Sequence, residues 1–192
     1  MANESNNKYP AKVSLSTNGV TFEDAIAVAR FGAKIELDAK AVSAISESRA
    51  YIEKYAAGDI PVYGVSTGFG ALANRYVSVE QRAQLQRSLI RSHAAGVGAP
   101  VEREVVRALM ALRLKTLASG RTGVRPVVAT TMAALLNAGI TPLVREFGSL
   151  GCSGDLAPLS HCALALMGEG RVHDANGVEM ETMQALNAAG IK

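Results

Sequence analysis

Residues 148–161 read GSLGCSGDLAPLSH, in which a glycine-rich stretch leads directly into apolar positions. Glycine occupies three of the first seven positions, and it permits sharp backbone bends because it lacks a Cβ atom. From Leu156 to Met167 no glycine occurs and apolar residues recur, which predicts a helix from about Asp155 to Met167. We therefore expect Cys152-Ser153-Gly154 to form an ordered bend at the start of an apolar helix.

The bend at Cys152-Ser153-Gly154 is open to more than one interpretation. If the nitrogen of Gly154 attacks the carbonyl carbon of Cys152, a five-membered ring closes, and Ser153 inside it can lose water to leave an exocyclic methylidene group. A serine among glycines is ordinarily only part of a turn, so the residues by themselves leave both interpretations open. A serine hydrolase fits less well, because its nucleophile turn requires Gly-x-Ser-x-Gly and Asp155 stands at the last position.

Helical periodicity accounts for most of the chain before this stretch. Thr21 and Asp24 form a capping-box-like start to one helix, and Pro126 and Gly139 bracket another in the proline-first, glycine-last pattern. Further helices are expected at about residues 38–57, 78–96 and 100–120. Short strands are expected at residues 12–15 and in a hairpin of 171–173 with 178–180, before a last short helix capped by Thr182. The sequence thus predicts a mainly α fold with a few short β-strands.

Composition and charge exclude several classes of protein. The net charge of +3 comes from 20 basic and 17 acidic residues spread along the chain, so neither nucleic-acid binding nor membrane binding is indicated. Arginines that recur at helical spacings are interpreted as solvated helix faces or subunit contacts: Arg82, Arg87, Arg91, Arg103, Arg107 and Arg113. No apolar run approaches the roughly 20 residues that span a bilayer, and no signal peptide is evident, so a cytoplasmic protein is expected.

The N-terminus is polar, and the chain has few cysteines. Residues 1–11 are polar and are expected to be a disordered N-terminus, followed by one domain over 12–192. Cys152 and Cys162 are the only cysteines, which is too few for a disulfide framework, and no Cys or His pair has metal-ligand spacing. His161 is interpreted as a helix-packing residue, and no metal is expected.

Residues 148–161 resemble the signature of the aromatic amino-acid ammonia-lyase and aminomutase family, and the resemblance continues over nearly the whole chain from about Thr21. In that family the three-residue core becomes a 4-methylidene-imidazol-5-one group autocatalytically. The resemblance implies that Cys152, Ser153 and Gly154 are the precursors of this group and that Ser153 supplies its reactive carbon. The first core residue is usually Ala; Cys-Ser-Gly is similar to the form in actinobacterial histidine ammonia-lyases, and the side chain of residue 152 stays outside the ring chemistry.

Two other segments carry the resemblance. Residues 63–70, YGVSTGFG, look like the family loop with a catalytic tyrosine, which implies that Tyr63 removes a proton. This loop does not end in the Lys-Ser/Thr of a phosphate-binding loop. Residues 85–96, LQRSLIRSHAAG, look like the segment that meets the substrate side chain. Ser92-His93 is similar to the pair of histidine ammonia-lyases, which implies that His93 binds the substrate, whereas phenylalanine-specific members have apolar residues there.

The resemblance therefore implies the N-terminal part of an enzyme that eliminates ammonia from L-histidine to give urocanate. It further implies the N-terminal domain and the start of the central helix bundle of such enzymes, and a homotetramer with a small amino-acid substrate. A tyrosine ammonia-lyase or aminomutase is the alternative, because His93 does not separate histidine from tyrosine. Family members are longer, so the chain by itself is expected to be inactive, and a truncated, non-catalytic helical fragment is a second alternative.

Overall fold

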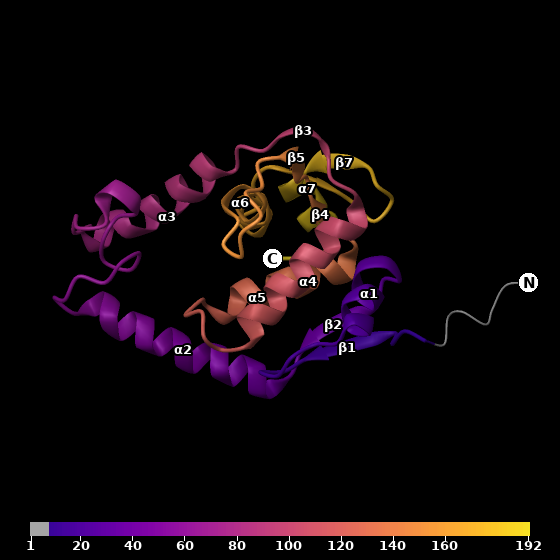
Figure 1. Cartoon of the computed structure of the whole chain (residues 1–192), viewed down its shortest axis with the longest axis horizontal. Helices are drawn as coiled ribbons and strands as arrows, with labels where there is room; N and C mark the ends of the chain where they lie inside the picture. Colours follow the sequence, from indigo (N-terminus) through magenta and orange to yellow (C-terminus); the bar gives the residue numbers. More distant parts are fainter. Residues whose placement is uncertain (1–7) are drawn as a thin grey trace, which may run out of the picture.

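The computed structural model describes residues 8–192, and Figure 1 shows a mainly helical molecule with short strands. The helices are α1 (Phe22–Arg30), α2 (Ala39–Ala57), the short 3-10 helix η2 (Gly70–Leu72), α3 (Val79–His93), α4 (Arg103–Ala118), α5 (Pro126–Ala138), α6 (Leu156–Leu166) and α7 (Thr182–Ala188). The strands are β1 (Lys12–Leu15), β2 (Lys34–Leu37), β3 (Val97–Pro100), β4 (Thr141–Pro142), β5 (Arg145–Phe147), β6 (Arg171–His173) and β7 (Glu179–Glu181). The predicted fold class is confirmed.

The N-terminal segment is described in part. The prediction of disorder over residues 1–11 falls largely on residues 1–7, which lie outside the described residues. In the described part, the ring of Tyr9 stacks on Phe31 with centroids 4.6 Å apart, and the carbonyl of Ala11 accepts a hydrogen bond from the amide of Lys34 (3.0 Å).

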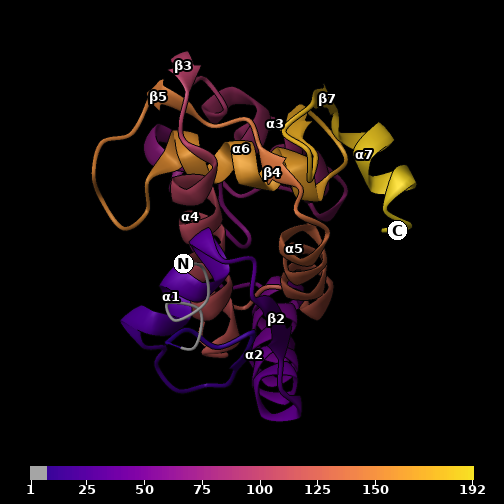
Figure 2. The same cartoon turned by 90° about the vertical axis from the view of Figure 1, so that its right-hand side faces the viewer.

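The core lies where α4 packs against α1 and α5. Leu114 and Leu117 of α4 and Leu135 and Leu136 of α5 are almost fully buried, and burial of such side chains is the main stabilising contribution to a fold. In Figure 2, α6 and β4 lie above α4 and α5, and α2 lies below them. The helix that follows the Cys152-Ser153-Gly154 bend is thus packed onto the central helices.

Arg107 of α4 joins this helix to the C-terminal ends of α1 and α5 by hydrogen bonds. Only 5% of its surface is exposed, and its guanidinium donates hydrogen bonds to the carbonyls of Val28 (2.7 and 3.0 Å) and Leu136 (3.0 Å). These carbonyls lie in the last turns of α1 and α5, where helix carbonyls lack intrahelical partners and attract positive charge. The interpretation of this arginine as part of a solvated face or subunit contact is therefore wrong.

Most predicted helices are present, with changes at their ends. Asp38 caps α2, Thr21 and Asp24 form the predicted capping box, and α5 ends at the left-handed Gly139. However, α3 ends at His93 rather than at Gly96, and α4 begins at Arg103 rather than at Pro100. The reason is that residues 97–100 form strand β3, which pairs with the distant β5. A pairing partner that far along the chain leaves no local pattern in the sequence.

The strands form small separate sheets. β1 pairs with β2 in parallel, β3 with β5 antiparallel, and β4, β6 and β7 form an antiparallel sheet that contains the predicted hairpin. β2, β3, β4 and β5 were not predicted. Thr182 is the first residue inside α7 rather than its cap, because its hydroxyl donates instead to the carbonyls of Glu169 (2.7 Å) and Gly170 (2.8 Å).

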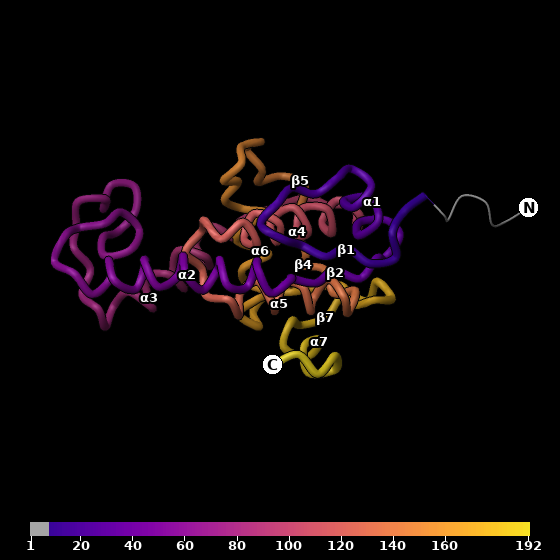
Figure 3. Tube along the Cα trace, turned by 90° about the horizontal axis from the view of Figure 1, so that it is seen from below, coloured from indigo at the N-terminus to yellow at the C-terminus, as the bar shows by residue number. Residues whose placement is uncertain are grey.

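The chain between α2 and α3 projects from this body. Figure 3 shows residues 58–78, together with the adjoining ends of α2 and α3, at the far end of the molecule from α1 and β1. We call residues 58–78 the lobe; it contains the glycine-rich stretch 63–70. Within it Ser66 and Thr67 are buried, and the hydroxyl of Ser66 accepts a hydrogen bond from the amide of Val62 (2.9 Å). The stretch 63–70 is thus held by internal hydrogen bonds.

Candidate active site

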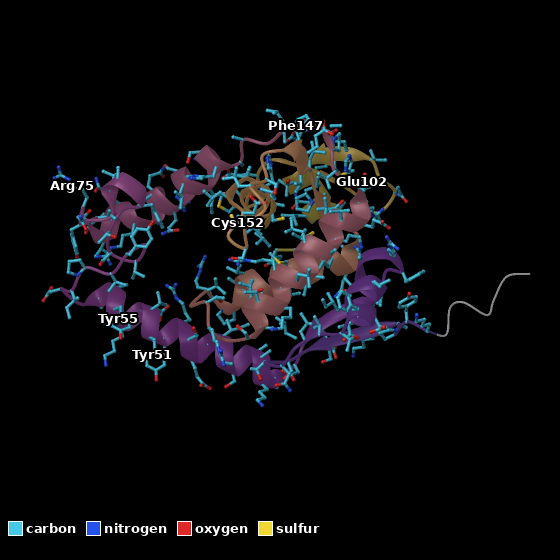
Figure 4. All side chains as sticks on the ribbon, in the orientation of Figure 1. Tyr51, Tyr55, Arg75, Glu102, Phe147 and Cys152 are labelled. Carbon is cyan, nitrogen blue, oxygen red and sulfur yellow. The ribbon has the colours of Figure 1, made fainter. Side chains whose placement is uncertain are left out.

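The Cys152-Ser153-Gly154 bend lies in an exposed loop between β5 and α6. Figure 4 places Cys152 on this loop beside α6. The three residues are exposed, and residues 153 and 154 form a turn immediately before the helix. The left-handed backbone lies earlier, at Gly148 (φ +151°) and Gly151 (φ +72°), and not at Gly154. A Cβ atom added at Gly154 would meet nothing within 4 Å, so there is room around the atoms that ring closure would move.

Asp155 holds the loop from its C-terminal side. It occupies the N-cap position of α6, as expected, but its side chain makes no capping hydrogen bond. Instead its carboxylate accepts hydrogen bonds from the hydroxyl of Ser149 and from the amide of Leu150 (2.9 Å). The hydroxyl of Ser149 in turn accepts from the amide of Gly151 (3.2 Å). The hydrogen bond from Ser149, and then that from Leu150, hold the pKa of Asp155 below its ordinary value.

His93 is the last residue of α3 and is half-buried. Its Nδ1 lies 2.8 Å from the carbonyl oxygen of Leu89 and 3.0 Å from the hydroxyl of Ser92. A carbonyl only accepts, so the contact with Leu89 favours the tautomer that carries its proton on Nδ1. Nε2 then has a free lone pair, and residues 8–192 provide no partner for it. This geometry is suited to binding a polar group that approaches His93 from outside the helix.

The segment after His93 meets the base of the loop. The amide of Gly96 donates a hydrogen bond to Nε2 of His161 on α6 (3.2 Å). A Cβ atom added at Gly148 would lie 3.1 Å from the Cα of Gly96, so these two backbones are in close contact. Arg91 and Glu169 add a bidentate ion pair (2.7 and 2.8 Å) from α3 to the chain beyond α6. The structure therefore brings the segment after His93 against Gly148 and α6, which lie on either side of the Cys152-Ser153-Gly154 turn.

Tyr63 lies elsewhere, in the lobe. Its side chain is 63% exposed, its ring meets Phe69 edge to face with centroids 5.8 Å apart, and its hydroxyl accepts a hydrogen bond from the amide of Gly70 (3.4 Å). In Figure 4 the label of Arg75 marks this lobe, well away from Cys152. Within the described part of the chain, no hydrogen bond or aromatic contact joins Tyr63 to His93 or to the 152–154 loop.

The remaining cysteine and the metal-binding residue types do not form a site. Cys162 is buried in the core, and this burial raises the pKa of its thiol to about 12. Across residues 8–192, no group of three or more His, Cys, Asp or Glu side chains is arranged to hold a metal ion. In the same range no helix combines the length and apolar character needed to cross a membrane.

Sequence reasoning did not identify Ser149 and Asp155 as partners, or Gly96 and His161. Ser149 and Asp155 are six residues apart, outside the three-residue spacing of a capping box, and Gly96 and His161 are 65 residues apart. The one available signal was the glycine at position 96. A Cβ atom there would lie 3.1 Å from Nε2 of His161, so a side chain at position 96 would crowd the imidazole.

Comparisons with known proteins identify the family of this chain. Residues 20–192 match the family described as aromatic amino acid lyase. The chain is 63% identical over 179 residues to a histidine ammonia-lyase of Streptomyces griseus, covering 93% of this chain and 35% of that protein. Among solved structures it is similar to a tyrosine aminomutase from Streptomyces globisporus (41% identity, TM-score 0.87) and to a histidine ammonia-lyase from Trypanosoma cruzi (34% identity, TM-score 0.83). Each match covers 94% of this chain and 34% of the solved chain, so the chain spans about a third of the length of its relatives.

Proposed function

The chain belongs to the aromatic amino acid lyase family, and from this premise we propose that it is the N-terminal part of a histidine ammonia-lyase, which converts L-histidine to urocanate and ammonia. The observation that supports the proposal is that two segments meet at α6. The exposed Cys152-Ser153-Gly154 loop leads into this helix, and the segment after His93 bonds to its His161 through Gly96. The 63% identity to a histidine ammonia-lyase supports histidine as the substrate.

The chain's own residues fit the formation of a methylidene-imidazolone group. Ring closure requires the nitrogen of Gly154 to reach the carbonyl carbon of Cys152, and these residues are exposed and lie in or next to a turn. Water leaves on ring closure, and a second water leaves from the side chain of Ser153. When present, the group supplies an electrophile that makes the nitrogen of the substrate a better leaving group. The role of Asp155 is to hold residues 149–151, so that the bend starts from a fixed point.

Helix α6 contributes through its N-terminus. The loop runs directly into this helix, whose first-turn amides and dipole favour negative charge nearby. Negative charge that develops on a carbonyl oxygen of the loop during the reaction would therefore be stabilised. His93 is proposed to contact the substrate imidazole through Nε2, since its Nδ1 already interacts with Leu89.

Tyr63 is proposed to remove the β-proton of the substrate. Its exposed position in the projecting lobe, without contact to the 152–154 loop, supports an active site shared between subunits, in which Tyr63 serves the loop of another copy. A homotetramer, as the family resemblance implies, provides such sharing. A cytoplasmic location remains a prediction from the sequence.

The alternative substrate is tyrosine. The TM-score to a tyrosine aminomutase (0.87) is slightly above that to a histidine ammonia-lyase (0.83), so the fold does not favour histidine over tyrosine. The residues that would bind the substrate carboxylate are expected beyond Lys192. The 192-residue chain alone is therefore expected to be inactive. The alternative of a non-catalytic fragment makes the same expectation for the chain alone.

An assay of the full-length protein tests the substrate. L-histidine and L-tyrosine are supplied in parallel, and the products are separated by chromatography. We expect urocanate and ammonia from histidine. The matched variant His93→Phe keeps an aromatic ring but lacks the imidazole nitrogens, and it should lose histidine turnover. Turnover of tyrosine without histidine turnover would contradict the proposed substrate.

A further inference from the structure

Three separate parts of the chain meet at Gly96. The end of α3 leads into it, the start of the 148–154 loop passes against it, and His161 reaches it from α6. A Cβ atom at position 96 would lie 3.1 Å from Nε2 of His161 and 3.5 Å from the carbonyl oxygen of Phe147. The side chain of Arg145 also donates to the carbonyl of Gly98 (2.8 Å), next to the same junction. This junction is thus one of the contacts that join the end of α3 to the loop and to α6.

The contact of His161 with Gly96 has a chemical requirement. A backbone amide only donates, so Nε2 of His161 must accept, and an imidazole with both nitrogens protonated cannot do so. Burial lowers the pKa of His161, and the positive charge of the facing Arg145 lowers it further. Both effects favour the neutral ring, in which Nε2 is free to accept.

We propose that His161 is a positioning residue of the active site. By accepting the hydrogen bond of Gly96, it holds the segment 94–96 in place, and thereby fixes the position of His93 relative to the Cys152-Ser153-Gly154 loop. This inference rests on the proposed function for its link to the substrate, but the contact itself can be tested without activity. His161 touches neither the substrate nor the reacting atoms in this account. Its loss should weaken substrate binding and leave ring formation intact.

Two variants of the full-length protein separate the hydrogen bond from the bulk of the side chain. His161→Phe fills a similar space but cannot accept a hydrogen bond, whereas the amide oxygen of His161→Gln can accept from Gly96. His173→Gln removes a histidine from β6, outside this junction, and serves as the control. Each variant is measured by hydrogen exchange of the peptide that covers residues 94–98 and by the kinetics of histidine turnover.

We expect His161→Phe to speed exchange of the 94–98 peptide and to raise KM for histidine about fivefold with kcat changed less, as loss of one neutral hydrogen bond allows. His161→Gln should recover most of both values, and His173→Gln should change neither. Unchanged exchange in His161→Phe would overturn the inference, whether or not the protein is active. Faster exchange with an unchanged KM would show a merely structural contact and would also overturn it. A wild-type protein without histidine turnover contradicts the proposed function instead, and the exchange result still decides the contact.

Discussion

At the scale of single residues, Asp155 and Ser149 fix the stretch that precedes the Cys152-Ser153-Gly154 turn. The carboxylate of Asp155 accepts from Ser149 and from the amide of Leu150, and Ser149 also accepts from the amide of Gly151. These bonds tie the loop to the first residue before α6. A loop held in this way loses less conformational entropy when its backbone closes into a ring. Two polar side chains would thus favour the proposed ring closure without taking part in it.

This arrangement predicts a titration shift. Ser149→Ala removes the largest cause of the lowered pKa of Asp155, so the pKa should rise toward the ordinary value of 3.8. Because the folded-state pKa is lowered, the contact adds stability above the unfolded-state value and is lost as the pH falls through the folded-state pKa. Carboxyl NMR titration of wild type and Ser149→Ala measures the difference.

The control for this titration is Ser46→Ala. The hydroxyl of Ser46 donates to the carbonyl of Val42 in α2, away from the loop. The pKa of Asp155 should be the same in this variant as in the wild type. An equal pKa in wild type and Ser149→Ala would show that Ser149 does not hold Asp155 in solution.

At the scale of elements, α4 forms the centre of the hydrophobic core that supports the loop. Leu114 is completely buried between the central helices, whereas Leu112, two residues earlier on the same helix, is 50% exposed. Leu114→Ala should lower the free energy of unfolding by about 2–5 kcal/mol, because it leaves a cavity in addition to lost apolar burial. Leu112→Ala should change it by only about 0.5 kcal/mol. Urea unfolding followed by circular dichroism compares the two; similar losses would contradict the described core.

The elements also show what a sequence can predict. Local signals predicted three elements that the structure confirms. A capping box marks α1, a first proline and a final glycine mark α5, and turn residues mark the 171–181 hairpin. β2, β3 and β5 depend on partners far along the chain, and such pairing leaves no periodic pattern in a strand of three or four residues. Pro100 was therefore misinterpreted as the start of a helix.

At the scale of the whole molecule, the three segments proposed to form one site do not all lie together. The segment after His93 and the 152–154 loop both adjoin α6, while Tyr63 lies in the lobe at the far end of α2. The sequence motifs indicated all three, because each is a continuous stretch. Their relative placement could not be predicted, since it depends on the packing of α3 on α6 and on the length of α2. The separation of Tyr63 from the loop is the observation behind the proposal that the site is shared between copies.

The proposed conversion of Cys152-Ser153-Gly154 to an electrophilic ring changes the mass of the protein, so the mass of the intact full-length protein shows whether the ring forms. Loss of two waters should make the wild type about 36 Da lighter than its sequence requires. Ser153→Ala lacks the side-chain hydroxyl and should not show this full loss, whereas Ser149→Ala, which keeps all three core residues, should retain it in at least part of the protein. A wild-type mass equal to that of the unmodified sequence would contradict the account.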